Sequence, residues 1–520
     1  MGGSRLPPLP TAFLQGRDRD LLAPVRFLPP GELPAEPLPQ IDRTRLAQAL
    51  ETANAAYGHP AAARQAALLA DPATRVVVTG QQPGLYGGPL YALSKMVAAV
   101  LWAEAISATG VPAVPVFWVA TEDHDWAEVA QAKFLTRKGV LKLDLGADPA
   151  PLLPVGMRTF GPGLTAIENE LALALPHQYR PDARFGEAFC RLMAAALGER
   201  APLMLDSMLP EVKQLQRPWL QRLVDQRQEV AAAQASADAA VQSRGYVLQV
   251  KPQPDASPLF MLHGQERRRI LWTEDGGYAL RGLEDEPKPL SELQRIIAEN
   301  PSVISPGVLA RPAIQDALLG TTLQVMGPAE LTYMSQVAPV YSVLGISPPW
   351  TSLRPQALIL EERQAGYLGE LAISLQELSD SSLDQLVADR LGEDVIGPVR
   401  DRIEQLLDSL TEPLMAIDRG LENPLRKTQA HITRGLDQLN GKVAKAVARG
   451  HEVWLRRLQQ VRQACFPEGH LQERVLSVGY FLDRHGPALA GSFCDQLGLD
   501  PRHLHIIRIS VSDRGREASQ

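Results

Sequence analysis

The spacing of apolar residues changes from helical to strand-like near residue 75. Residues 45–69 repeat apolar side chains every three to four positions before Asp71-Pro72, which predicts an amphipathic helix. Residues 75–79 read Arg-Val-Val-Val-Thr, a β-branched run typical of a strand that is buried on both faces. That strand leads directly into a glycine-rich loop at residues 80–89. This order of elements favours an α/β fold.

A second strand follows after one more helix. Residues 90–109 present an apolar helix face that ends at Gly110, and residues 114–120 form another apolar run. Residues 121–126 then read Thr-Glu-Asp-His-Asp-Trp. A strand, a helix and a strand in this order form a βαβ unit, which predicts a parallel sheet with a right-handed crossover. Ligands of open parallel sheets bind beyond the carboxyl ends of the strands, where both unusual loops lie.

The middle of the chain alternates between the two periods. Residues 183–197 and 209–241 are predicted to be helical, and residues 247–250 and 269–272 are predicted to be strands whose order the pattern does not give. Residues 322–326 form a further apolar run that ends in a Gly-Pro turn and opens a helix. This turn is a third candidate for the ligand-facing edge.

The C-terminal third has the texture of a coiled coil. From about residue 399, apolar residues recur at spacings of three and four in two runs, separated by residues 418–424. We predict an antiparallel hairpin whose tip lies in that gap and whose second arm continues to Val461.

A chain of 520 residues exceeds the size at which one core stops growing, so appended parts are expected. We predict a core with connecting insertions over residues 1–385, the coiled-coil hairpin over residues 386–465, and a segment over residues 466–520 that packs back on the core.

Composition excludes several function classes. The formal net charge of -7 argues against a partner made of nucleic acid. The N-terminus lacks the pattern of a signal peptide, and no run approaches the roughly 20 apolar residues that cross a bilayer, so we expect a cytoplasmic protein without a membrane partner. Cys190, Cys465 and Cys494 lack the spacing of a metal site, so we predict buried cysteines and no protein-bound metal.

The glycine-rich loop is the first candidate site. Its glycines permit close approach to an anion, and the following helix presents free amides, so phosphate is a reasonable ligand. The spacing matches neither of the common phosphate-binding glycine motifs, and an ordinary strand-to-helix turn is the alternative. The candidate residues here are Thr79, Gly80, Gln81, Gln82, Gly84, Gly88 and Lys95.

The acidic cluster after the second strand is the next candidate. Glu122, Asp123, His124 and Asp125 place three carboxylates beside one imidazole, where they would repel one another without a cation, an amine ligand or an imidazolium. His124 could act as an acid, as a base or as a hydrogen-bond donor to phosphate. Asp123 or Asp125 could bind a substrate amine or a metal. The alternative is a solvated helix cap. We take His124, Asp123 and Asp125 as the catalytic candidates and Glu122 as a binding residue.

Two later segments carry further polar candidates. Arg311, Gln315 and Asp316 share a predicted helix start, and Arg354 is placed to reach a phosphate or a carboxylate. Surface ion pairing is the alternative explanation for either arginine.

These motifs together resemble those of the cysteine-adding enzymes of bacillithiol biosynthesis. The resemblance rests on the sequences Thr-Gly-Gln-Gln-Pro-Gly-Leu at 79–85, Glu-Asp-His-Asp at 122–125 and Gly-Pro-Ala-Glu at 327–330, and it extends over nearly the whole chain. It implies a Rossmann-like core related to class I aminoacyl-tRNA synthetases, connecting insertions, a C-terminal coiled-coil hairpin and a homodimer. It also adds Gly327, Glu330 and Tyr333 to the binding candidates.

The resemblance implies a ligase that joins the carboxyl group of L-cysteine to the amine of glucosaminyl malate. An amide does not form from a free carboxylate at a useful rate, so we expect ATP with magnesium to activate the cysteine carboxyl as an acyl-adenylate or an acyl-phosphate. The two nucleotide motifs of the related synthetases are absent. Residues 87–90 read Gly-Gly-Pro-Leu where the His-x-Gly-His motif would stand, and the chain has no copy of the Lys-Met-Ser-Lys-Ser motif. The alternatives are nucleotidyl or phosphoryl transfer to another small molecule, or a non-catalytic coiled-coil adaptor.

Overall fold

The computed structural model divides the chain into two compact units. The core unit comprises Arg5–Ile359 and Gln472–Gln520, and the helical unit comprises Leu360–Leu471. The structure describes residues 6–34, 41–171, 178–253, 255–391, 396–448 and 451–509.

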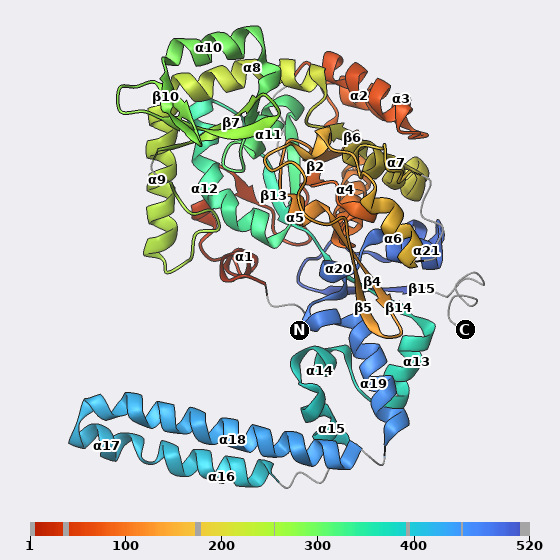
Figure 1. The fold of residues 1–520 in the computed structure, drawn as a ribbon, viewed down its shortest axis with the longest axis vertical. Coiled ribbons are helices and arrows are strands. Elements are labelled where there is room, and N and C mark those ends of the chain that lie inside the picture. Colours follow the sequence, from red (N-terminus) through yellow and green to blue (C-terminus); the bar gives the residue numbers. More distant parts are fainter. Residues whose placement is uncertain are drawn as a thin grey trace. The chain divides into compact units, whose positions relative to one another are not determined.

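A six-stranded parallel sheet forms the centre of the core unit (Figure 1). Its order is β1 (Arg26–Phe27), β13 (Trp350–Leu353), β12 (Thr321–Met326), β2 (Arg75–Gln81), β3 (Ala113–Val119) and β6 (Leu203–Asp206). Every neighbouring pair is parallel. With α4 (Tyr91–Ser107) between β2 and β3, the predicted βαβ unit and the α/β class are confirmed. The chain leaves β2 toward β3 and returns on its other side at β12, so the sheet has a topological switch point at β2.

Helices cover both faces of this sheet. On one face, α4 and α7 (Phe185–Leu197) share a hydrophobic core with Val77, and the rings of Phe117 and Phe189 stack 5.7 Å apart. On the other face, α2 (Thr44–Ala56) packs in a separate core with Val76 and its strand neighbours. Successive residues of β2 therefore enter different cores, which explains its uninterrupted apolar sequence.

Three predicted elements differ in the structure. The helix predicted over residues 45–69 is divided into α2 and α3 (Ala62–Ala70), because Gly58 adopts a φ of 80° and Pro60 cannot continue a helix. The stretch at residues 209–241 is likewise α8 (Pro210–Asp225) and α9 (Arg227–Ser243). Residues 247–250 form no strand, and the amide of Val250 bonds instead to the side chain of Gln336.

An antiparallel sheet is inserted between β6 and β12. Its order is β10 (Leu283–Lys288), β9 (Tyr278–Leu280), β8 (Glu266–Trp272), β7 (Ala256–His263) and β11 (Ile304–Pro306). The predicted strand at residues 269–272 lies within β8. A separate hairpin is formed by β4 (Gln131–Thr136) and β5 (Gly139–Asp144).

The end of the chain belongs to the core unit. It forms α20 (Gln472–Val475), α21 (Val478–His485), α22 (Ala488–Gln496) and β15 (Leu504–Ile509). The backbone amide of Leu90 donates to the carbonyl of Leu476 at 2.9 Å, and the amide of Val478 donates to the carbonyl of Gly88 at 2.9 Å. The C-terminal segment is therefore hydrogen-bonded to the turn that precedes α4.

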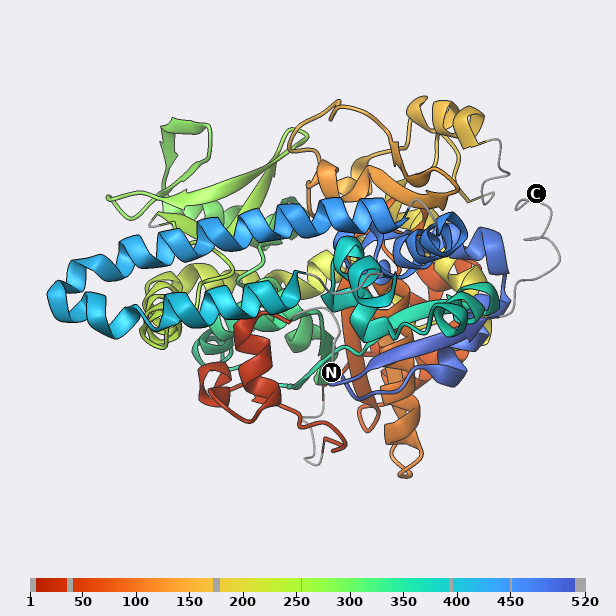
Figure 2. The same ribbon diagram turned by 90° about the horizontal axis from the view of Figure 1, so that it is seen from below.

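The helical unit contains the predicted coiled-coil hairpin. Figures 1 and 2 show α16 (Gly397–Asp408) and α17 (Thr411–Ile417) running back along α18 (Glu422–Ala448). The chain turns at Arg419–Leu421, inside the predicted tip. The second arm was predicted to continue to Val461, but Glu452–Cys465 is a separate helix, α19, that packs on α13 (Glu362–Leu371).

The three cysteines are buried and free, as predicted. Across the described residues, no helix combines the length and the apolar character needed to span a membrane.

Candidate active site

A pocket of about 440 Å³ opens at the carboxyl ends of β2, β3, β12 and β13. It lies at the switch point of the parallel sheet, where such folds bind ligands. Eleven of the candidate residues line it: Gly80, Gln81, Gln82, Lys95, Glu122, Asp123, Arg311, Gly327, Glu330, Tyr333 and Arg354. The structure thus brings together residues from all three candidate loops.

Lys95 links the two halves of the sheet beneath the pocket. Its Nζ donates to the carbonyl oxygen of Gly80 at 2.7 Å, to Oε1 of Gln81 at 3.0 Å and to Oε2 of Glu330 at 2.5 Å. Glu330 Oε2 also accepts from the amide of Gly327 at 2.8 Å, which places the start of α12 (Pro328–Leu344). The Lys95 side chain is only 4% exposed, and burial lowers the pKa of its ammonium group while Glu330 opposes that change. The ammonium group of Lys95 therefore donates its hydrogen bonds mainly to acceptors within the protein.

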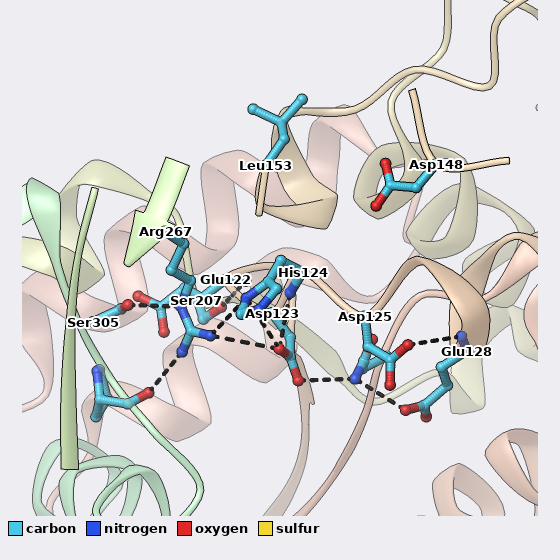
Figure 3. A network of polar contacts seen from close by, with 12 residues as sticks. Glu122, Asp123, His124, Asp125, Glu128, Asp148, Leu153, Ser207, Arg267 and Ser305 are labelled. Carbon is cyan, nitrogen blue, oxygen red and sulfur yellow. Dashed lines mark hydrogen bonds and ion pairs between the residues drawn. The ribbon is translucent and has the colours of Figure 1, made fainter. Parts of the chain in front are cut away.

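Asp123, His124 and Arg267 form a polar group on the pocket wall (Figure 3). Arg267 reaches it from β8 of the inserted sheet, with NH1 3.5 Å from Asp123 Oδ1 and 3.3 Å from His124 Nδ1. Burial and then the positive charge of Arg267 lower the pKa of His124, which favours a neutral imidazole. His124 does not itself line the pocket, whereas Asp123 does.

The other members of the acidic cluster have separate partners. Glu122 forms a buried ion pair with Lys213, whose Nζ also donates to the carbonyl of Ile304. Asp125 lies outside the pocket and caps α5 (Trp126–Val129) by accepting from the amide of Glu128 at 3.2 Å. Within the described part of the chain, no group of three or more His, Cys, Asp or Glu side chains is placed to hold a metal ion.

Glu128 lines the pocket, and the sequence did not single it out. Gln81 Nε2 donates to its Oε1 at 2.7 Å, and Gln82 Nε2 donates to its Oε2 at 3.0 Å. The concave pocket removes much of its water, and the charges of Asp125 and Asp123 add to this effect, so the pKa of Glu128 is raised to about 7. The signal in the sequence was its spacing of three residues from Asp125, which is typical of a helix cap.

Arg311 and its neighbours form the opposite wall. The guanidinium of Arg311 donates to Gln315 Oε1 at 2.8 Å and to the hydroxyl of Tyr333 at 3.2 Å. Both partners are neutral, and among the described residues Arg311 has no carboxylate ion pair. Gln315 and Asp316 lie behind the wall rather than in it, and the carboxylate of Asp316 accepts from the hydroxyl of Tyr341 at 2.5 Å.

Two arginines complete the lining. Arg354, at the end of β13, forms an ion pair with Glu473 at 2.7 Å, and both side chains are almost fully buried. Arg474 follows Glu473 in sequence, is exposed, and lines the pocket without a hydrogen bond or an ion pair to any described residue. Sequence reasoning did not name Arg267, Glu473 or Arg474 as site residues, because contacts between segments far apart in the chain bring them to the pocket.

Three residues of the glycine-loop prediction lie outside the pocket lining. The Thr79 hydroxyl donates to the carbonyl of Val325 at 2.8 Å and ties β2 to β12. Gly84 and Gly88 face each other, since a Cβ added to Gly84 would lie 2.8 Å from the Gly88 Cα. The amide of Gly87 donates to the hydroxyl of Tyr179 at 2.9 Å. This turn is packed mainly against other parts of the chain.

Comparisons with known proteins agree with this architecture. Residues 34–355 match the family model of the N-terminal Rossmann-like domain of the bacillithiol biosynthesis protein BshC, and residues 357–507 match the model of its C-terminal coiled-coil domain. A relative from Salinibacter ruber, named "Putative cysteine ligase BshC", is 31% identical over 90% of this chain and 89% of its own length.

Relatives from other bacteria carry the same name. The protein from Solibacter usitatus is 29% identical over 83% of this chain and 84% of its own length. The protein from Geobacillus thermodenitrificans is 27% identical over 80% of this chain and 81% of its own length. From the two domain matches and this coverage, the chain belongs to the BshC family of bacillithiol biosynthesis proteins.

Proposed function

We propose that this protein is a ligase that forms an amide bond between the carboxyl group of L-cysteine and the amine of glucosaminyl malate, with ATP as the activating cosubstrate. The observation that carries the proposal is the division of charge in the pocket. Arg311 and Arg474 offer cations without carboxylate partners, and Asp123 and Glu128 offer carboxylates. Substrates that bear both carboxylates and an amine match this arrangement.

The start of α12 supports a place for phosphate. Gly327, Pro328 and Ala329 line the pocket. The Gly327 amide donates to Glu330 and Pro328 has no N–H group, so the Ala329 amide is the one of the three without an acceptor within the helix. This amide and the positive end of the helix dipole favour an anion. Arg311 and Arg474 would contribute the hydrogen bonds that hold its oxygens. When bound, ATP supplies an activated form of the carboxyl group with a phosphate-containing leaving group.

The residues of the chain then have separate tasks. Arg311 and Arg474 orient the anionic groups, and Asp123 holds the amine in its ammonium form. Arg267 orients Asp123 from the inserted sheet, while Lys95 keeps the ends of β2 and the start of α12 at a fixed distance. His124, with its lowered pKa, supports the position of Asp123 from outside the pocket, where its backbone amide donates to Asp123 Oδ1 at 2.8 Å.

The proposal includes a homodimer in the cytoplasm. The resemblance of the sequence motifs suggests the dimer, and the hairpin offers apolar side chains to a second chain: Leu406 is 62% exposed on α16 and Ile417 is 77% exposed on α17. Sedimentation velocity of the full chain tests the dimer, and a monomer at micromolar concentration would contradict it.

The reaction is tested by mass spectrometry of mixtures that contain the purified chain, ATP with magnesium, L-cysteine and glucosaminyl malate. We expect the amide product only in the complete mixture, together with AMP and pyrophosphate or with ADP and phosphate, which distinguishes the two forms of activation. Product that forms equally well without ATP would contradict the activation step. Nucleotide turnover without cysteine, and no amide product, would favour transfer to another small molecule.

A further inference from the structure

Glu128 occupies the part of the pocket wall where the end of β2 meets α5. The Gln81 and Gln82 side chains donate one hydrogen bond each to its two carboxylate oxygens, at 2.7 and 3.0 Å. Both partners are neutral amides, and Glu128 remains exposed to the pocket. Its carboxylate is therefore held in place and remains reachable by a bound molecule.

The Gln82 amide holds two carboxylates next to each other. Its Nε2 donates to Asp123 Oδ2 at 2.9 Å as well as to Glu128 Oε2. Its Oε1 is buried and has no hydrogen-bond partner within the part of the chain that the structure describes. A buried acceptor without a partner is unfavourable, so this orientation of the amide is kept at some loss of stability. Figure 3 shows Asp123 between Arg267 and Glu128 in this network.

The charges around Glu128 are mainly negative. No described cation forms an ion pair with it, and the ammonium group of Lys95, whose charge opposes the rise in pKa, is committed to Glu330 and to the carbonyl of Gly80. Desolvation in the pocket and then the neighbouring carboxylates raise its pKa to about 7. Charges that act on Glu128 are those of Asp125, Asp123, Lys95 and Glu330, the charge of Glu128 acts in turn on Tyr91, and Arg354 and Arg474 line the same pocket.

We propose that Glu128 is the proton acceptor for the substrate amine, and that Gln82 positions it beside Asp123, which binds the same amine as an ammonium ion. This inference rests on the proposed ligase function. In the step, a proton leaves the ammonium nitrogen for Glu128, and the nitrogen lone pair forms the bond to the activated carbonyl carbon. The bond from that carbon to the phosphate oxygen breaks, and the leaving group takes its electron pair. The second proton of the nitrogen passes to the departing phosphate group or to water, which leaves the neutral amide.

The pH dependence of kcat/KM tests this role in the full chain. We expect the rate of the native protein to rise with pH through about 7 as Glu128 loses its proton. Glu128→Gln cannot accept a proton, so kcat falls by about 100-fold or more, with a small change in KM.

A second variant identifies the group whose loss of a proton makes kcat/KM rise with pH. Asp125→Asn removes a negative charge that raises the pKa of Glu128, and asparagine still caps α5. We expect the acid limb of the profile to move to lower pH. The ionisation of the substrate amine in solution would not respond to this change.

Glu51→Gln is the matched control, because Glu51 is an exposed residue of α2 outside the pocket. We expect native rates and a native profile from it. If the native protein forms the product but Glu128→Gln keeps its kcat and its acid limb, or Asp125→Asn leaves the limb unmoved, the role of Glu128 is overturned while the ligase function stands. If the native protein forms no product, the ligase function falls, and this inference falls with it.

Discussion

At the scale of single residues, the site contains two kinds of cation: those that are paired within the protein and those that remain available to a ligand. Lys95 has three protein acceptors and a nearly buried side chain, and Arg354 forms a buried ion pair with Glu473 and donates to the carbonyl of Pro355. Arg311 and Arg474, in contrast, keep donors available to the pocket. The distinction between a structural and a ligand-binding cation therefore follows from its partners rather than from its position in a motif.

Lys95→Met tests the structural role of this lysine. The substitution leaves the carboxylate of Glu330 and the carbonyl of Gly80 without their cation. We expect the free energy of unfolding, measured with urea, to fall by about 3 kcal/mol. Lys138→Met, at an exposed position in the turn between β4 and β5, is the control and should change little. Unchanged stability together with weaker nucleotide binding would instead assign Lys95 to the ligand.

Asp316 gives a pH dependence of stability. Burial, opposed by hydrogen bonds from Tyr341 and its neighbours, raises the pKa of its carboxyl group to about 6. An unfolded aspartate titrates near 3.9, so the native state binds the extra proton between these values. The stabilisation is present below about pH 4 and is lost as the pH rises through 6, by roughly 3 kcal/mol in total.

Asp316→Asn removes this titration. We expect the free energy of unfolding of the variant to change less between pH 4 and pH 6 than that of the native protein, in chemical denaturation at each pH. Parallel pH profiles for the two proteins would show that Asp316 is charged throughout this range.

At the scale of elements, the C-terminal segment completes the turn before α4. Leu476 and Val478 supply backbone partners to Leu90 and Gly88, and Gly87 contacts the Val478 side chain. Because Arg474 belongs to the same segment, its place in the pocket depends on this contact.

Gly87→Ala tests that packing. Gly87 has a φ of 83°, and an added Cβ would lie 2.8 Å from Cβ of Val478. Gly110 has a φ of 88° with open space around it, so Gly110→Ala measures the backbone cost alone. We expect thermal unfolding of Gly87→Ala at a clearly lower temperature than Gly110→Ala. Equal unfolding temperatures would mean that the segment moves away from Gly87 without cost.

The sequence predicted elements whose signals are local. The βαβ unit of β2, α4 and β3 and the tip of the hairpin followed from period and turn chemistry. The inserted sheet did not, because its pairing joins distant residues, such as Ile304 with Met261. For the same reason the sequence indicated Asp123 and Arg311 but not Arg267, which only the inserted sheet brings to Asp123.

At the scale of the whole molecule, one pocket collects residues from Gly80 to Arg474. It lies within the core unit, at the switch point of the parallel sheet, and both family domains of BshC are present in the chain. The match to BshC and the division of charge in this pocket support the same conclusion. The central claim is that amide formation takes place in this pocket.

The most direct test of that claim is the amide product formed by Arg311→Met, measured by mass spectrometry beside the native protein and Arg217→Met. Arg311 lines the pocket, whereas Arg217 is an exposed residue of α8 that lies outside it. Losing a charged hydrogen bond of about 1.5–3 kcal/mol predicts a decrease of about 10-fold or more in kcat/KM for Arg311→Met, with native values for Arg217→Met. Native kcat/KM in a folded Arg311→Met protein would contradict the assignment of this pocket as the ligase site.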